Sequence, residues 1–245
     1  MQRKTKQPLA FLAIMVLFMQ MLFGSLPVMA IDENNTISSI VTQIPTTSAD
    51  SAAITQQTTT ADSAVIYVKQ GASGDGTSWA NAFGDLQSAL DEASTKLTAG
   101  ATTVQIWLAQ GTYIPSEKVG GTTDRYNTFQ MQNNVAIYGG FNGTETTVTE
   151  RDWKNHKTML SGDIDNTPTD NTGNAYRVFY HPSGLNLNDT AILDGVTITG
   201  GNADHPDTPE RNGGGMYNAN SSPSLTNVIF SSNTASYYGG HVQYL

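Results

Sequence analysis

The residues of this chain best suited to chemistry are the acidic side chains of one short polar segment. Asp163, Asp165 and Asp170 stand close together there, with Asn166 between them. Alternating carboxylates on a loop can supply the oxygen ligands that Ca²⁺ takes in proteins. The segment has neither the turn glycine nor the closing glutamate of a calcium-binding loop, so Asp163 as the cap of a simple turn is the alternative. We expect no cofactor, and the alternative is a Ca²⁺ ion bound at this loop.

Carboxylates can also catalyse the hydrolysis of glycosidic bonds. That reaction needs two carboxyl groups about 5–10 Å apart across one groove. Asp163, Asp165 and Asp194 meet this requirement only if the fold stacks them on one face, which their spacing in the sequence does not establish. We therefore assign no catalytic residue from the sequence.

The histidines and aromatic residues are scattered along the chain. No histidine has the spacing typical of a metal site, so surface or turn positions are expected for His156, His181, His205 and His241. Aromatic residues within apolar bursts are expected in the core, namely Trp107, Tyr138, Phe141, Phe179 and Phe230. Tyrosines in or beside loops are the better candidates for stacking on sugars, namely Tyr113, Tyr126, Tyr217, Tyr237 and Tyr238.

The overall composition favours a β-rich fold and excludes several kinds of partner and site. Only 13% of the residues are charged, about half of the usual ~25%, and this suits strands and turns better than helices with charged outer faces. The formal net charge of −9 repels a nucleic-acid backbone, so no nucleic-acid partner is expected. The absence of cysteine excludes disulfides, thiol catalysis and zinc sites with thiolate ligands.

The first 30 residues have the three-part order of a secretory signal. A basic start is followed by an apolar run over 9–23, a break at 24–27, and a pattern of small residues that predicts cleavage after Ala30. An uncleaved anchor is the alternative, although the run is shorter than the ~20 residues of a membrane span. No later stretch is long and apolar enough to span a membrane, so we expect a secreted or cell-surface protein.

A polar linker and a folded domain follow. Residues 31–64 are dominated by Thr, Ser, Ala, Gln and Asp, which predicts a disordered linker, with a glycosylated spacer as the alternative. The folded domain is expected over 65–245. Its one convincing helix is placed at about 83–98, where apolar residues recur at helical spacing before Gly100.

After the helix, short apolar bursts alternate with clusters of Gly, Asn, Asp and Ser. The bursts lie at 104–109, 135–141, 158–160, 177–180, 191–199 and 224–231. Each is too short for a helix, and intervals of roughly 20–30 residues are too wide for hairpins. This pattern predicts an all-β fold in which parallel strands stack as the coils of a β-helix. A β-sandwich is the rival fold, but its hairpins would bring the strands closer together in the sequence.

Two pairs of segments favour such stacking. Residues 193–198 align with 225–230, and apolar side chains then match at alternate positions. In the same way, the run 213–216 is echoed by 238–241, which sets Met216 against His241. Both alignments predict neighbouring strands with corresponding residues side by side.

Several motifs over residues 65–240 resemble those of a known group of proteins. They include Gly76-Thr77-Ser78-Trp79, Ile106-Trp107-Leu108-Ala109 and Leu160-Ser161-Gly162-Asp163. On these motifs, the domain resembles bacterial secreted β-helix proteins of the pectin-lyase-like superfamily. The resemblance implies a right-handed parallel β-helix, with the helix at 83–98 covering one end of the solenoid.

The closing segments also resemble the repeats of chlamydial polymorphic outer-membrane proteins. Those repeats combine a Gly-Gly-small-aliphatic tetrad with a Phe-x-x-Asn tetrad. Gly214-Gly215-Met216-Tyr217 departs from the first tetrad in its last two residues, whereas Phe230-Ser231-Ser232-Asn233 keeps the second. The relatives continue through more coils to an anchor or barrel. This chain ends within a coil, which favours a truncated or frame-shifted member over a complete protein.

A long flat surface is expected to carry the function. The first expectation is a secreted or cell-surface scaffold for adhesion or glycan binding, whose partner is a polysaccharide or a host or neighbouring cell surface. The alternative is a polysaccharide lyase or glycoside hydrolase, or its N-terminal fragment, and a purely structural spacer is a third. The resemblance implies that a lyase would use calcium-binding acids and a base, but no such motif is found among Arg151, Lys154, Lys157, Arg177 and Arg211.

Overall fold

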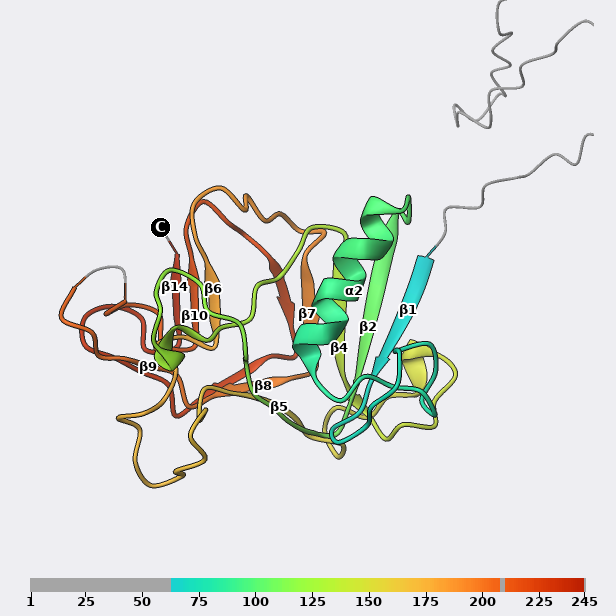
Figure 1. The fold of residues 1–245 in the computed structure, drawn as a ribbon, viewed down its shortest axis with the longest axis horizontal. Coiled ribbons are helices and arrows are strands. Elements are labelled where there is room, and N and C mark those ends of the chain that lie inside the picture. Colours follow the sequence, from blue (N-terminus) through green and yellow to red (C-terminus); the bar gives the residue numbers. More distant parts are fainter. Residues whose placement is uncertain (1–62, 208–209, 245) are drawn as a thin grey trace, which may run out of the picture. The chain divides into compact units, whose positions relative to one another are not determined.

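Most of the regular structure in this protein is β-strand, arranged in parallel sheets. The computed structural model describes residues 63–207 and 210–244, and Figure 1 shows their fold. Within these ranges the elements are short strands, one α-helix and two single-turn 3₁₀ helices, η1 (Asp124–Tyr126) and η2 (Val148–Glu150). The expected signal segment, its cleavage site at Ala30 and nearly all of the expected linker lie outside the described residues.

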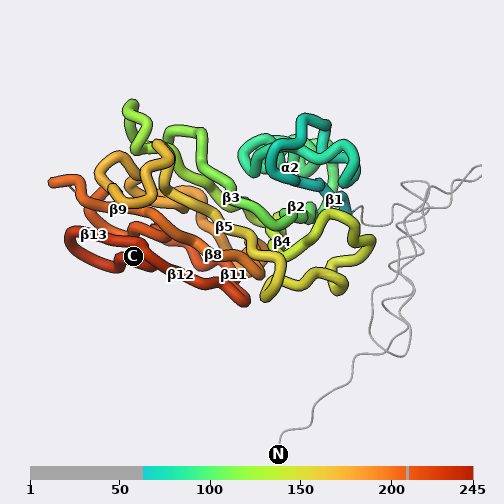
Figure 2. The backbone as a smooth tube through the Cα atoms, turned by 90° about the horizontal axis from the view of Figure 1, so that it is seen from below, coloured from blue at the N-terminus to red at the C-terminus, as the bar shows by residue number. Residues whose placement is uncertain are grey.

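Four parallel sheets contain the strands. The first has the order β1 (Ser63–Val68), β2 (Thr103–Ala109), β4 (Val135–Phe141), β7 (Ile192–Asp194) and β11 (Ser224–Thr226). The second has the order β3 (Gly111–Tyr113), β5 (Thr158–Ser161), β8 (Thr197–Thr199) and β12 (Ile229–Ser231). Figure 2 shows the strands of this second sheet next to one another in that order. The third joins β6 (Phe179–His181), β10 (Met216–Asn218) and β14 (Val242–Tyr244), and the fourth pairs β9 (Asn202–Ala203) with β13 (Thr234–Ala235).

Rows of apolar side chains in register form the core. In the first sheet, one row consists of Ile66, Ile106, Ile137, Leu193 and Leu225. A second row consists of Tyr113, Leu160, Ile198 and Phe230, and a third of Phe129, Phe179, Met216 and Val242. All three rows belong to a single cluster of buried side chains and the partly buried ones packed on it. Side chains alternate between the two faces of a strand, so this packing turns the residues between them outward.

Helix α2 (Leu86–Thr98) lies alongside β1 and β2 (Figure 1). It begins at Leu86 rather than at the predicted position 83. The Asp85 carboxylate caps it, because the carboxylate oxygens accept hydrogen bonds from the Ser88 N–H and hydroxyl, each at 2.8 Å. Phe83 instead forms a parallel bridge with Val68. The end of the helix before Gly100 is confirmed.

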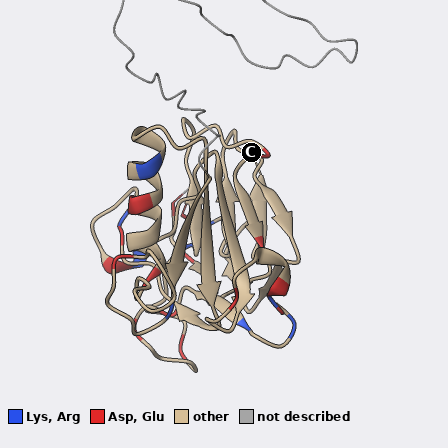
Figure 3. Ribbon diagram, turned by 90° about the vertical axis from the view of Figure 1, so that its right-hand side faces the viewer, with Lys and Arg blue, Asp and Glu red and all other residues tan. Residues whose placement is uncertain are grey.

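Charged residues are sparse on the strands. Figure 3 shows the Lys, Arg, Asp and Glu residues mainly on α2 and in the loops, with the sheets almost entirely tan. This distribution explains the low charged fraction of the chain, since the strands face either the core or neutral polar surroundings. Most ion pairs among the described residues accordingly involve loop or helix side chains, and Asp194 at the end of β7 pairs with Arg151.

Candidate functional site

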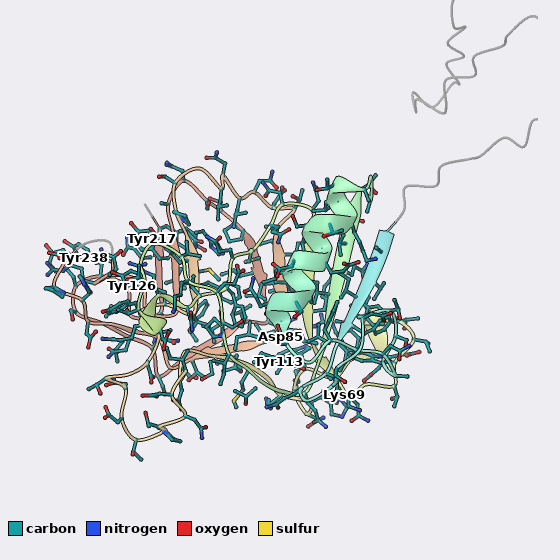
Figure 4. All side chains as sticks on the ribbon, in the orientation of Figure 1. Lys69, Asp85, Tyr113, Tyr126, Tyr217 and Tyr238 are labelled. Carbon is teal, nitrogen blue, oxygen red and sulfur yellow. The ribbon has the colours of Figure 1, made fainter. Side chains whose placement is uncertain are left out.

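Tyrosine and arginine side chains gather on one part of the described domain. Figure 4 shows Tyr126, Tyr217 and Tyr238 at the same end of it, distant from Lys69 and Asp85 in that view. Contacts between aromatic rings, and between rings and guanidinium groups, connect these tyrosines to other tyrosine and arginine side chains. We call this group the tyrosine–arginine patch; its members are Tyr126, Tyr176, Tyr180, Tyr217, Tyr237, Tyr238, Arg125, Arg177 and Arg211.

Two neighbouring strands supply the centre of the patch. Tyr180 in β6 pairs in register with Tyr217 in β10, and the ring centroids are 5.6 Å apart. These rings point away from the core because the preceding residues, Phe179 and Met216, point into it. The guanidinium carbon of Arg177 lies 4.3 Å from the Tyr180 centroid and 4.9 Å from the Tyr217 centroid. The strands thus hold a cation against two aromatic faces.

Arg125 connects the patch to two loops. Its guanidinium carbon lies 4.1 Å from the ring centroid of Tyr176, and the rings of Tyr176 and Tyr126 form a T-shaped contact. Arg125 Nε donates to the carbonyl oxygen of Asn174 at 2.7 Å, and Nη2 donates to Asp204 Oδ1 at 2.6 Å. The charge of Arg125 is therefore partly balanced by an ion pair with Asp204.

The most exposed side chains of the patch are Tyr237 and Tyr238, which lie beside the half-buried Arg211. Tyr237 and Tyr238 are 56% and 55% exposed, and their ring centroids lie 4.1 Å apart. The guanidinium carbon of Arg211 lies 4.2 Å from the Tyr237 centroid. Asn212 links this part to the buried part, because its side-chain oxygen accepts from the Tyr238 N–H and its carbonyl accepts from Arg177 Nε.

Burial affects the ionisation of the patch. It raises the pKa of Tyr180 and of Tyr217, and also that of Tyr126, where the negative charge of Glu210 adds to the effect. The three hydroxyls therefore stay protonated at neutral pH and can donate hydrogen bonds. Burial lowers the pKa of Arg177, although a guanidinium group remains charged in proteins. The patch thus offers hydroxyl donors and positive charge together.

The predicted acidic loop is held by its own hydrogen bonds. The Thr167 N–H donates to Asp163 Oδ1 at 2.8 Å, and the Thr167 hydroxyl donates to Asp165 Oδ1 at 2.7 Å. Asp170 Oδ1 accepts from the Thr172 N–H at 2.9 Å, which lowers the pKa of Asp170. Asp163 thus fills the turn-capping role that was the alternative to calcium binding.

A polar cavity of about 570 Å³ lies beside this loop. Asp163 and Asp170 line it, whereas Asp165 does not. Hydroxyl and amide side chains supply much of the remaining lining, among them Ser161, Thr167, Asn171, Asn174, Thr199 and Thr234. The buried side-chain oxygen of Asn174 has no hydrogen-bond partner among the described residues. The cavity therefore presents two carboxylates and several neutral hydrogen-bonding groups.

The three predicted calcium ligands, Asp163, Asp165 and Asp170, all contact Thr167 in one hydrogen-bonded loop. In the part of the chain that the structure describes, no group of three or more His, Asp or Glu side chains is placed to hold a metal ion. Asp163 and Asp170 line the cavity and Asp165 does not, and calcium binding at this loop stays a prediction. Asp194, the third candidate for hydrolysis, accepts hydrogen bonds from Arg151 Nη2 at 2.5 Å and from Asn227 Nδ2 at 2.9 Å.

Asn233, from the second tetrad of the repeat motif, joins neighbouring strands. Its side chain is buried, its Nδ2 donates to the Ile198 carbonyl at 2.8 Å, and its Oδ1 accepts from the Gly201 N–H at 2.9 Å. Phe230 of the same tetrad packs on the core from β12. These two residues thus connect the segment that contains β12 to the neighbouring segment that contains β8.

The first tetrad, at 214–217, allows two backbones to approach closely. A Cβ atom on Gly214 would overlap the Thr234 carbonyl oxygen, and one on Gly215 would overlap the His241 carbonyl oxygen. Met216, which follows, is fully buried in the core. The tetrad is therefore a packing feature, and only Tyr217 within it belongs to the patch.

Three expectations about single side chains are wrong. Tyr113 and Tyr217, both expected beside loops as sugar platforms, lie in strands β3 and β10 and are only 2% and 5% exposed. The Tyr113 hydroxyl donates to the Ala109 carbonyl at 2.9 Å. His181, expected at the surface or in a turn, is completely buried in β6. All three residues belong to strands that are only three residues long, and strands this short leave little periodicity in the sequence.

Several members of the patch could not be singled out from the sequence. Tyr176 and Tyr180 lie beside and within the apolar burst at 177–180, Arg125 lies between two bursts, and none of the three carries a motif. The one usable signal was the position of Tyr180 directly after the buried Phe179, which places it on the outer face of its strand. No sequence pattern indicated that this face meets Arg177 and Tyr217.

In class, the described domain is a predominantly β protein built of parallel sheets, with an aromatic and cationic patch and a polar cavity on its surface. Comparisons with protein-family models, with curated proteins and with solved structures yield no match for this chain. Among the described residues, the one α-helix does not have the length and apolar character that crossing a membrane requires.

Proposed function

We propose that this domain is a right-handed parallel β-helix that serves as a secreted or cell-surface scaffold for glycan binding. The strand order supports the fold, because β7 to β10 are followed by β11 to β14 and each of the later strands pairs in parallel with the corresponding earlier one. Connections between parallel strands of one sheet are nearly always right-handed. Helix α2 would then cover the end of the solenoid beside β1.

The location of the protein is inferred from its sequence. The signal-like segment 1–30 supports secretion, and the motifs shared with pectin-lyase-like proteins and chlamydial repeats support a place at the cell surface. The partner would be a polysaccharide or the glycans of a host or neighbouring cell.

The single observation that carries glycan binding is the exposed pair Tyr237 and Tyr238 beside Arg211. Sugar rings have apolar C–H faces that stack on aromatic rings, and hydroxyl groups that accept and donate hydrogen bonds. Tyrosine supplies both a ring and a hydroxyl, and arginine supplies a fork of N–H donors. Two rings more than half exposed and next to a guanidinium therefore match the chemistry of a sugar.

Replacing Tyr237 and Tyr238 together by alanine should weaken glycan binding by at least about 30-fold, which corresponds to the ~2 kcal/mol of a binding hot spot. The loss is expected because both stacking surfaces disappear while the sheets stay intact. A glycan array with the intact protein would identify the ligand, and titration calorimetry would then compare the affinities of the intact and variant proteins.

Tyr244→Ala is the matched control for this experiment. Tyr244 is 50% exposed in β14 and is not part of the patch, so its removal should leave the affinity unchanged. The proposal would be wrong if the intact protein bound no glycan on the array and no cells in adhesion assays. It would also be wrong if Tyr244→Ala lost as much affinity as the double variant.

The second candidate function is hydrolysis of a polysaccharide. It is favoured by the cavity that Asp163 and Asp170 line together, since glycoside hydrolysis uses two carboxyl groups across one groove. The neutral hydroxyl and amide groups around these carboxylates would hydrogen-bond to sugar hydroxyls. No lyase step is derived, because the sequence has no recognisable lyase motif among its basic residues.

Asp163→Asn and Asp170→Asn test this candidate. If the cavity hydrolyses glycans, each variant should lower the release of reducing ends by at least about 100-fold, the usual contribution of one acid–base group. Asp165→Asn serves as the control, because Asp165 does not line the cavity. No release of reducing ends by the intact protein on pectin, alginate or plant glucans would exclude hydrolysis of these substrates.

A further inference from the structure

Arg177 is a buried arginine without an acidic partner. The residue is 3% exposed, and within residues 63–207 and 210–244 no carboxylate oxygen lies within 4.0 Å of its guanidinium. Its Nε donates to the Asn212 carbonyl at 3.0 Å, whereas its buried Nη2 has no hydrogen-bond partner among these residues. A buried charge is costly unless it is paired and hydrogen-bonded. Among the described residues, the Arg177 guanidinium therefore has no ion-pair partner.

The surrounding side chains reduce the free-energy cost of burying the Arg177 charge without removing it. The rings of Tyr180 and Tyr217 attract the guanidinium through their faces. Glu210 exerts an electrostatic pull on Arg177, but its carboxylate does not come within ion-pair distance. Arg125 contributes another positive charge, partly balanced by Asp204.

A small cavity lies against Arg177. Its volume of about 10 Å³ leaves room for one particle of roughly the size of water. Arg125 and Arg177 both line it, together with Tyr126, Tyr180 and Asn127. The side-chain oxygen of Asn127 is also buried without a hydrogen-bond partner. Two unsatisfied polar atoms therefore belong to residues that meet at one cavity.

We propose that this cavity binds a single halide-class anion, with Arg177 as its principal ligand. A chloride ion is only somewhat larger than a water molecule, and it accepts hydrogen bonds from guanidinium and hydroxyl groups. A half-turn of the Asn127 amide directs its NH₂ group instead of its oxygen into the cavity. The anion then neutralises the buried charge of Arg177.

Two further features bear on this site. The chain has a formal net charge of −9, which disfavours diffuse anion binding, so bound halide requires local donors of this kind. The site is also independent of the proposed glycan binding, because Tyr237 and Tyr238 do not line the cavity. The competing occupant is one water molecule that bridges Arg177 Nη2 and Asn127 Oδ1.

Crystals of the protein grown in sodium bromide would test the site directly. An anomalous peak for bromide is expected in the cavity between Arg177 and Asn127. Water density there with no anomalous peak would overturn the proposal, because it would identify the bridging water as the occupant.

Thermal unfolding provides the solution test. With halide at ten times its Kd, the Tm should be about 3 °C higher than in sodium gluconate of equal ionic strength. Arg177→Met should fold, because apolar groups of similar volume replace buried charges well, and its Tm should no longer depend on halide. Arg211→Met is the matched control and should keep the halide response, because Arg211 stacks on a tyrosine but does not line the cavity.

The outcomes separate the possible occupants. A bromide peak together with a halide response that Arg177→Met abolishes supports the proposal. A bromide peak without any halide response identifies an adventitious ion only and overturns it. A halide response that persists in Arg177→Met also overturns it, since the anion would then act elsewhere on the protein.

Discussion

Gly214→Ala is expected to destabilise the domain by about 3 kcal/mol, the upper range for overpacking in a closely packed interior. The added Cβ would overlap the Thr234 carbonyl oxygen and lie 3.0 Å from that of Gly201. Both neighbours are backbone atoms, so no side-chain rotation can relieve the overlap, and adjacent rows of strands would have to separate. Urea unfolding followed by circular dichroism would measure the change in the free energy of unfolding.

Gly240→Ala is the matched control for this substitution. Gly240 precedes β14 as Gly214 precedes β10, and the nearest atom to its added Cβ is the Asn233 carbonyl oxygen at 3.0 Å, with the next at 3.6 Å. We expect a loss below about 1 kcal/mol, because small shifts relieve such a contact. Equal losses in the two variants would show that close backbone approach is not the reason for glycine at position 214.

Acidification is expected to cost the domain about 3 kcal/mol through His181, since each pKa unit of difference between the folded and unfolded states corresponds to ~1.4 kcal/mol. Burial lowers the pKa of His181 to about 4, from 6.5 in the unfolded chain. Between these values the unfolded state binds the proton and the folded state does not. Stability is therefore complete above pH 6.5 and falls as the pH drops toward 4.

The hydrogen bonds of His181 explain why the folded state resists the proton. The Met131 N–H points at Nε2 from 3.1 Å, so Nε2 must remain an acceptor. Nδ1 lies 2.6 Å from Asn218 Oδ1 and therefore carries the single ring hydrogen. A second proton on Nε2 would face the Met131 N–H in a site that excludes water.

His181→Gln tests this origin of the pH dependence. The glutamine keeps a polar side chain in the site and does not titrate, so urea unfolding of this variant should depend less on pH between 6.5 and 4. His241→Gln, at an exposed position, should leave the pH dependence of the intact protein unchanged. If both variants retained the full dependence, His181 would not be its source.

The sequence predicted best the strand pairing in which apolar and polar side chains alternate most regularly. The alignment of 193–198 with 225–230 is confirmed, because Leu193 pairs with Leu225 and Ile198 with Phe230. The alignment of 213–216 with 238–241 is wrong by one residue, because Met216 pairs with Val242 rather than His241. Apolar side chains determine register through the face they must occupy, whereas a run of glycines fits equally well at adjacent registers.

The periodicity of apolar residues also did not predict the residue at which the helix begins. Phe83 continues the helical spacing of apolar residues, yet it pairs with Val68 and leaves the cap to Asp85. The carboxylate of Asp85 satisfies the free N–H of Ser88, and this decides where the helix begins. The sequence shows a residue that can cap a helix, Asp85, close to the expected start. It does not show that this cap, rather than the apolar spacing, determines the first residue of the helix.

The amino-acid sequence by itself determined the predominantly β class, the approximate position of helix α2 and the outward or inward orientation of residues on the longer strands. These properties depend on local spacing, which any window of the chain displays. Only the tertiary structure decided that Tyr126, Arg177, Tyr217 and Tyr237 form one patch and that His181 is buried. The physical reason is that parallel pairing joins segments far apart in the sequence, and its register depends on the packing of the whole core rather than on any single segment.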